Sequence, residues 1–168
     1  EVTLVSGPVQ IAPPLCVRVI PVVTAADMAV AVKECYQEQD IIIKTAAVAD
    51  YRPAHPADEK VKKKDDKSVM ELERTEDILA YLGAHRKDGQ FICGFSMETE
   101  NMLENSRAKL AKKNVDMIVA NNLKVAGAGF GTDTNVVTII TKDDCRQLER
   151  MSKAAVAASI VDEILKKM

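Results

Sequence analysis

The stretch FICGFSM (91–97) predicts a short buried strand, and it is followed by an amphipathic helical segment at 101–113 and by a second apolar run, DMIVANN (116–122). Short β-branched and apolar runs that alternate with helical stretches are typical of a parallel sheet covered by helices on both faces. This stretch therefore predicts an α/β fold.

The same alternation continues upstream. Thr24, with Asp27 three residues on, is expected to cap a helix that runs to about Gln39, and Thr75 is expected to cap one that runs to about Arg86. Strands are expected at 2–6, at 17–23, at 40–49 as a buried strand, and at 69–73.

Downstream of 122 the pattern changes. VVTIIT (136–141) predicts a strand, and a turn at 142–144 is expected to lead into a return strand at 146–150. A helix from Ser152 to Lys167 closes the chain. We expect the end of the sheet to be antiparallel.

These elements predict a Rossmann-like, doubly wound, mainly parallel sheet with an antiparallel extension near the C-terminus. No linker or internal repeat divides residues 1–168, which predicts a single domain. The opening EVTLVSGP has the pattern of a second strand, so we expect a domain that is N-terminally incomplete. The pairing of the first two strands stays open, because the link between Ser6 and Val17 is short for a helical crossover.

Composition excludes several classes of protein. The chain has 168 residues, 47% of them hydrophobic and 29% charged, which fits one globular domain. A net charge of −2 gives no basic field for nucleic acid, and no apolar run approaches the roughly 18 residues of a membrane span. The cysteines lack metal or disulfide spacing and are expected to be reduced core residues of a cytoplasmic protein. They are Cys16, Cys35, Cys93 and Cys145.

Ligands of open α/β sheets bind beyond the carboxyl ends of the strands. Small residues there let a ligand approach the backbone, and Phe95 could offer an apolar face to a flat ring. The alternative, that these residues only pack, stays open. The strand-end residues are Ser6–Pro8, Ala46, Ala47, Asp50, Arg52, Gly94, Phe95, Asn121 and Asn122.

Three features point to phosphate. The loop EKVKKKDDK (59–67) is rich in lysine, whose point charge neutralises polyphosphate oxygens, and Lys109 and Lys113 share one helix face. The N–H groups at the helix start favour an anion, although Glu76 and Asp77 would repel one unless they point away or hold a metal ion. A solvated charge run remains the alternative.

Common catalytic and phosphate motifs are missing. The chain has no G-x-x-x-x-G-K-[ST] motif, and GAGFG (127–131) lacks the dinucleotide spacing. Two scattered histidines give no Ser/His/Asp arrangement. The residues alone thus predict a nucleotide-binding or phosphate-binding α/β domain.

Five separated motifs carry a resemblance. In order they are AAVADYRP (46–53), EKVKK (59–63), GFSMET (94–99), AKLAKKNVDMIVAN (108–121) and GFGTDTNVVTII (129–140). From about Glu1 to Leu165 the chain resembles the phosphopantothenoylcysteine synthetase domain of bacterial coenzyme A biosynthesis. The resemblance implies ligation of 4'-phosphopantothenate with cysteine by way of an acyl-cytidylate made from CTP with Mg²⁺, and release of CMP and pyrophosphate.

The resemblance also implies roles for residues. Lys60 would meet the phosphates and help to form the acyl-cytidylate, and Ala46 and Ala47 would border the activated acyl group. Asp50 would contact the cytidine part of CTP, and Phe95 would lie against the nucleotide. The remaining CTP-binding positions are Lys109, Lys113 and the backbone of Glu76, Asp77, Ile78 and Leu79. Metal ligands stay unassigned.

Partners follow from the resemblance as well. It implies a homodimer and a flavin-dependent decarboxylase, fused or separate, with no flavin in this domain. Where the family often has Asn-Pro, this chain has Thr75–Glu76, and the family's Asn-Arg-Ser-Ser-Gly segment would precede Glu1. Two alternatives stay open: a non-catalytic CTP-binding or dimerising fragment, and a Rossmann-type dehydrogenase, although the glycine fingerprint of the latter is absent.

Overall fold

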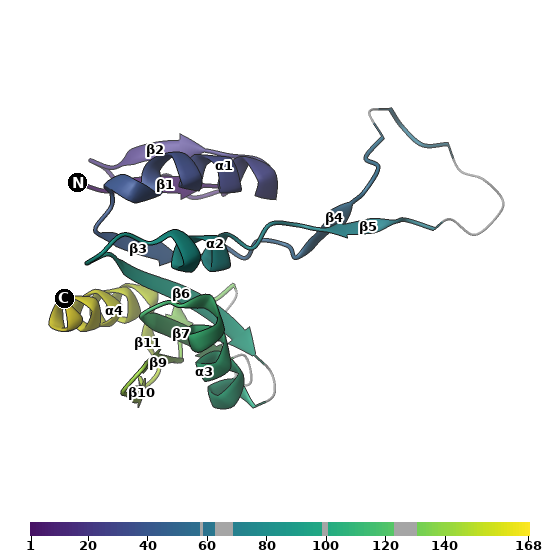
Figure 1. Ribbon diagram of the computed structural model, residues 1–168. Coiled ribbons are helices and arrows are strands. Elements are labelled where there is room, and N and C mark those ends of the chain that lie inside the picture. Colours follow the sequence, from purple (N-terminus) through teal and green to yellow (C-terminus); the bar gives the residue numbers. More distant parts are fainter. Residues whose placement is uncertain (58, 63–68, 99–100, 123–130) are drawn as a thin grey trace. The chain divides into compact units, whose positions relative to one another are not determined.

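The computed structural model describes residues 1–57, 59–62, 69–98, 101–122 and 131–168 (Figure 1). The chain forms two compact units. The first comprises Glu1–Glu34 and Ala47–Asp77, and the second comprises Cys35–Ala46 and Ile78–Met168. The single domain expected over 1–168 stays a prediction.

In the first unit, β1 (Thr3–Ser6) pairs in parallel with β2 (Arg18–Pro21), which resolves the pairing that the sequence left open. The residues between them form no helix. Helix α1 (Ala25–Cys35) starts as predicted. The Asp27 N–H donates to Thr24 Oγ1 at 3.1 Å, and the Thr24 N–H donates to Asp27 Oδ2 at 2.9 Å. The bond from the Thr24 N–H to the carboxylate lowers the pKa of Asp27, and both bonds fix the first turn.

Two predicted boundaries along this part of the chain were wrong. The helix after Thr24 ends at Cys35 and is followed by the 3-10 turn η1 (Tyr36–Glu38). Strand β3 (Ile41–Lys44) is only half-buried and stops well before residue 49. Residues 45–50 are instead irregular, so the small residues there belong to a connection rather than to a buried strand.

A short antiparallel ladder follows this connection. Strand β4 (Tyr51–Pro53) pairs with β5 (Leu72–Arg74), and Tyr51 lies opposite Arg74. Both strands are exposed. Arg52 of β4 and Glu73 of β5 lie opposite each other and form an ion pair, with 2.7 Å between Arg52 Nε and Glu73 Oε1. The sequence predicted no strand at 51–53 and placed the second strand one to three residues early.

The second unit contains a five-stranded sheet in the order β10-β9-β7-β6-β3. Strands β3, β6 and β7 are parallel, whereas β9 and β10 are antiparallel to their neighbours. This arrangement confirms the predicted α/β fold and its antiparallel extension. Besides β3, the sheet contains β6 (Phe91–Glu98), β7 (Met117–Asn122), β9 (Val137–Thr141) and β10 (Cys145–Gln147). Strand β10 begins one residue before the predicted return strand at 146–150 and ends three residues before the predicted end of that strand.

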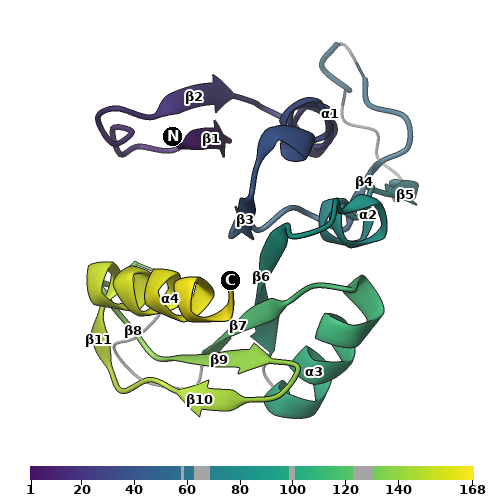
Figure 2. The same ribbon diagram turned by 60° about the vertical axis from the view of Figure 1, so that its left-hand side comes forward.

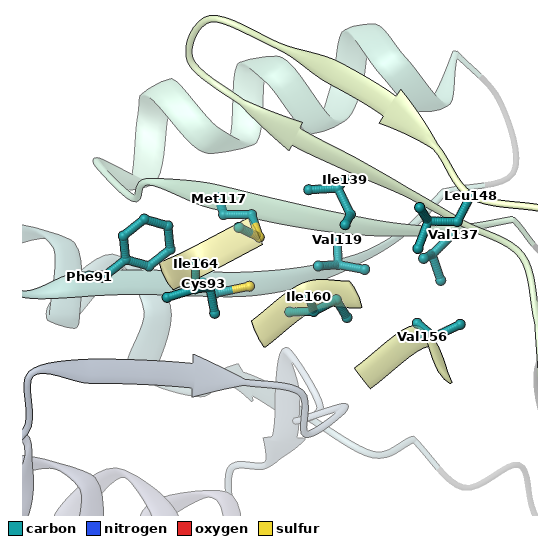
Figure 3. Packing of buried hydrophobic residues seen from close by; sticks show 10 residues of the cluster. All are labelled: Phe91, Cys93, Met117, Val119, Val137, Ile139, Leu148, Val156, Ile160 and Ile164. Atoms are coloured by element: carbon teal, nitrogen blue, oxygen red, sulfur yellow. The ribbon is translucent and has the colours of Figure 1, made fainter. Parts of the chain in front are cut away.

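Helices cover both faces of this sheet (Figure 2). Phe91 and Cys93 of β6 pack in a cluster with residues of α4 (Lys153–Lys167), and Figure 3 shows Val156, Ile160 and Ile164 turned toward the strands. On the opposite face, Ser106 Oγ of α3 (Met102–Lys113) donates to Ser96 Oγ at 3.2 Å. The even-numbered and odd-numbered residues of β6 therefore serve two different helix layers.

The closing segment begins with a ladder that the sequence did not predict. Strand β8 (Thr134–Asn135) pairs with β11 (Met151–Ser152) immediately before α4. The predicted closing helix starts at Lys153, and Ser152 is its N-cap, because the Ser152 side chain accepts from the Ala155 N–H at 3.2 Å. None of the helices in the described residues is long and apolar enough to cross a membrane.

Helices α2 (Ile78–His85) and α3 approach each other at Gly83. A Cβ on Gly83 would lie 1.8 Å from the backbone oxygen of Lys113. Asn114, which ends α3 in a left-handed conformation with φ of 52°, donates from Nδ2 to the Gly83 oxygen at 2.8 Å. The absence of a side chain at Gly83 therefore sets the distance between the two helices.

The cysteines do not all belong to the core. Cys93 is fully buried, and burial raises the pKa of its thiol to about 12. Cys16 is exposed and has φ of 64°, so the prediction of a core residue was wrong for Cys16. Cys35 and Cys145 are half-buried, and all four are free thiols.

Gly83→Ala is expected to destabilise the fold by at least about 2 kcal/mol, because the new methyl group collides with backbone rather than with a movable side chain. Urea unfolding measures the change. Gly7→Ala is the control, since a Cβ there meets no atom within 4 Å, and it should stay within about 0.5 kcal/mol of the parent. Equal stabilities of the two variants would contradict the close helix contact.

Alkylation with iodoacetamide at about pH 8 should distinguish Cys16 from Cys93, since the thiolate is the reactive form. We expect rapid modification of exposed Cys16 and none of Cys93 until denaturant is added. Peptide mass spectrometry locates the label. Modification of native Cys93 at the rate of Cys16 would mean that the strand core is open.

Candidate functional site

The candidate residues come from both compact units. Asp50, Lys60, Ala47, Glu76 and Asp77 belong to the first, whereas Ala46, Ile78, Leu79, Phe95, Lys109 and Lys113 belong to the second.

In the first unit, Thr75 joins two parts of the candidate site. Its hydroxyl donates to the backbone oxygen of Ala49, and its N–H donates to the backbone oxygen of Asp50 at 3.0 Å. The predicted N-cap role of Thr75 was wrong, because α2 begins only at Ile78, three residues later. Thr75 instead holds the main chain of Asp50 beside Glu76.

The carboxylate of Glu76 is paired with a cation. Lys33 Nζ, in the last turn of α1, lies 2.6 Å from Glu76 Oε1 and 2.7 Å from Oε2. The sequence raised the question of how an acidic residue could precede a helix start that favours anions. The structure answers it for Glu76, whose side chain points toward Lys33.

The lysine-rich connection between β4 and β5 is described only in part. Lys60 and Lys62 are exposed, as is the side chain of Asp50 before β4. The other lysines of this connection, Lys63, Lys64 and Lys67, lie outside the described residues.

In the second unit, Ala46 follows the end of β3 and is half-buried. Its backbone oxygen accepts from Lys44 Nζ at 2.9 Å, so this carbonyl already has a cationic donor. Ile78 and Leu79 are buried in the first turn of α2. Leu79 packs so closely on β6 that a Cβ at Gly94 would lie 2.5 Å from its Cδ2. Only the backbone of these two residues suits a polar ligand.

Phe95 and the α3 lysines differ in burial. Phe95 is half-buried and packs against the core cluster of β6, β7 and α4, which is the packing role that the sequence left open beside the nucleotide role. Lys109 and Lys113 are half-buried on α3, one turn apart. The contact of Lys113 with Gly83 fixes the backbone of that turn.

Asn121, at the carboxyl end of β7, has a feature that the sequence could not indicate. Its Oδ1 atom is buried and accepts no hydrogen bond from the described part of the chain. A buried acceptor without a donor costs about 1–3 kcal/mol. The sequence identified Asn121 as a strand-end residue but predicted no role for it, because residue type alone does not show that a side-chain oxygen is buried.

Acidic side chains in the described residues do not gather into a metal site. No group of three or more His, Cys, Asp or Glu residues is close enough to hold an ion in the ranges that the structure describes. Mg²⁺ can bind through one or two carboxylates and the oxygens of a phosphate ligand. The residues present thus fit a metal ion that accompanies a nucleotide better than a resident one.

Comparisons with known proteins agree with the fold. The family model of the "DNA/pantothenate metabolism flavoprotein C-terminal domain" matches residues 1–168. The "Coenzyme A biosynthesis bifunctional protein CoaBC" of Bacillus subtilis is 50% identical over 166 residues, which are 98% of this chain and 41% of that protein. A "Cysteine/Cysteine sulfinic acid decarboxylase" of an unknown prokaryotic organism is 46% identical over 98% of this chain and 46% of its own length. The chain thus spans less than half of these relatives.

A solved structure gives a fuller match. The crystal structure of the C-terminal domain of a coenzyme A biosynthesis bifunctional protein CoaBC has a TM-score of 0.83 and 45% sequence identity. The match covers 99% of this chain and 76% of that one.

Thr75→Val is expected to lower the free energy of unfolding by about 0.5–1.5 kcal/mol, since it removes the hydrogen bond to Ala49 and keeps the volume. Thr75→Ser keeps the hydroxyl and should lie close to the parent. Urea unfolding compares the three proteins. An N-cap role would instead make Thr75→Asn as stable as the parent, a result that would argue against the bond to Ala49.

Proposed function

The chain belongs to the family of the DNA/pantothenate metabolism flavoprotein C-terminal domain, and from this premise we propose that it ligates 4'-phosphopantothenate with cysteine in a CTP-dependent reaction. The observation that carries the proposal is the match to the solved C-terminal domain of CoaBC, at 45% identity over 99% of this chain. The name of that protein places it in coenzyme A biosynthesis, and we extend that pathway to this chain.

The proposed chemistry has two steps. A carboxylate oxygen of 4'-phosphopantothenate attacks the α-phosphorus of CTP, and the bond to pyrophosphate breaks to leave an acyl-cytidylate. The amine of cysteine then attacks the acyl carbon, CMP leaves with the bonding electrons, and the amine loses a proton to solvent as the amide forms. A free carboxylate is a poor electrophile, and the cytidylate supplies its leaving group.

Lysines suit the first step because negative charge shifts to the departing pyrophosphate. We assign Lys60 to these phosphates and to formation of the acyl-cytidylate. Its exposure in the connection between β4 and β5 leaves the ammonium accessible to a ligand. Lys109 and Lys113 are assigned to the same CTP, with a half-buried position on α3 that restricts their motion.

The remaining assignments are contacts to substrate rather than chemistry. Asp50 would contact the cytidine and Phe95 the nucleotide, and the backbone at Glu76, Asp77, Ile78 and Leu79 would surround the phosphates. Ala46 and Ala47 would border the acyl group. The buried Asn121 Oδ1 supports a ligand at this sheet edge, because an N–H of the ligand could satisfy it.

Mg²⁺ is proposed to arrive with CTP and to neutralise part of its phosphate charge. Asp50 and Asp77 are exposed carboxylates in the candidate site that could contribute a ligand. The chain's own task is then to position the nucleotide and the carboxylate, which requires few general bases.

The cellular setting belongs to the same proposal. We place the activity in the cytoplasm and in a homodimer, with a flavin-dependent decarboxylase either fused to this domain or separate. The match covers only 41% of the Bacillus subtilis protein, so the activity of that whole protein involves more chain than is matched here.

Pyrophosphate release tests the proposal. The chain is incubated with CTP, Mg²⁺ and 4'-phosphopantothenate, with and without cysteine. Turnover that requires CTP and yields the cysteine amide is expected. CTP binding without pyrophosphate release would favour a non-catalytic nucleotide-binding fragment, and hydride transfer with a nicotinamide cofactor would favour a dehydrogenase.

Lys60→Gln should reduce the rate of pyrophosphate release by about a hundredfold or more, because it removes a charge that acts on the leaving group. The fold should be unaffected, since Lys60 is exposed. Lys142→Gln, in the exposed turn before β10, is the charge-matched control and should retain the parent rate. A folded Lys60→Gln protein with the parent rate would refute the role of Lys60.

A further inference from the structure

We propose that Lys33 is a positioning residue of the nucleotide site: it holds the carboxylate of Glu76 and cancels its charge, so that the phosphates of a nucleoside triphosphate can lie beside the main chain before α2. The inference rests on the proposed CTP-dependent function and assigns a role to a residue that the sequence motifs do not contain. Lys33 acts through Glu76 and needs no contact with the ligand.

The geometry of the pair supports this role. Lys33 Nζ lies within 2.7 Å of both oxygens of Glu76, although the two residues are 43 positions apart in the chain. Both belong to the first compact unit. Their side chains are 34% and 44% exposed, so water reaches the pair and its contribution to stability is small. Because the pair adds little to stability, the role that we propose for it is electrostatic and concerns the bound ligand.

Thr75 makes the direction of Glu76 matter. The main chain before Glu76 is held by the bonds of Thr75 to Ala49 and Asp50. With the backbone fixed in this way, Lys33 decides where the carboxylate points. A carboxylate without this partner would remain next to the backbone N–H groups that are proposed to receive phosphate.

Charge sets the expected size of the effect. Glu76 alone adds one negative charge near an anion that carries several, and the pair with Lys33 adds none. Between exposed groups this repulsion is reduced by water and salt. We therefore expect loss of Lys33 to weaken CTP binding about threefold to tenfold at low ionic strength, and less at high ionic strength.

A double-mutant cycle tests the inference. CTP dissociation constants are measured by calorimetry for the parent, Lys33→Met, Glu76→Gln and the double variant. Lys33→Met should bind CTP most weakly, and Glu76→Gln should stay within about twofold of the parent, because Lys33 acts through the carboxylate that this variant lacks. The double variant should return to within about twofold of the parent. Lys87→Met, which removes an ammonium that lies 3.6 Å from Asp40 Oδ1, is the charge-matched control and should bind like the parent.

Each alternative outcome has a distinct meaning. If the parent does not bind CTP, both the proposed function and this inference fail. If the parent binds and Lys33→Met binds equally well, only the inference fails. If the double variant is as weak as Lys33→Met, Lys33 is structural and does not act through Glu76. Should Lys33→Met not fold, Lys33→Gln replaces it with the same expected order of affinities.

Discussion

Burial of β6 on both faces is the constraint on which the second unit depends. Phe91 to Gly94 are all buried, so each face of the strand needs a helix layer. The cluster with α4 fills one face, and Leu79 and α3 fill the other. Because β3 and β7 run parallel to this strand, their carboxyl ends lie at the same edge of the sheet. Ala46 and Asn121 are placed there for that reason.

The sequence predicts elements whose own residues carry the signal. Strands β6, β7 and β9 are continuous apolar runs, and α3 and α4 show helical spacing, so their places were confirmed. The ladders β4–β5 and β8–β11 join short polar segments far apart in the chain, and such pairing has no periodic pattern. Thr24 and Thr75 show what the sequence cannot predict, since both precede a helix. The Thr24 hydroxyl caps its own helix, whereas the Thr75 hydroxyl donates to the carbonyl of Ala49, which is distant in the chain.

The candidate site was predictable as a set of residue types and not as a set of neighbours. Strand ends and lysines could be chosen from the sequence, and their roles toward CTP stay predictions. The ion pair of Glu76 with Lys33, the bonds of Thr75 and the buried oxygen of Asn121 depend on contacts across the fold. The pair with Lys33 would let the acidic Glu76 stand in the proposed phosphate site, a question that residue type alone left unresolved.

The central claim is that a carboxylate is activated by transfer of CMP, and isotope transfer tests it most directly. The chain is supplied with CTP, Mg²⁺, cysteine and 4'-phosphopantothenate whose carboxylate carries ¹⁸O, and the ¹⁸O content of each product is measured by mass spectrometry. An acyl-cytidylate predicts one ¹⁸O in CMP, because the attacking carboxylate oxygen leaves with the α-phosphorus. Label in inorganic phosphate, unlabelled CMP, or no turnover would contradict the account.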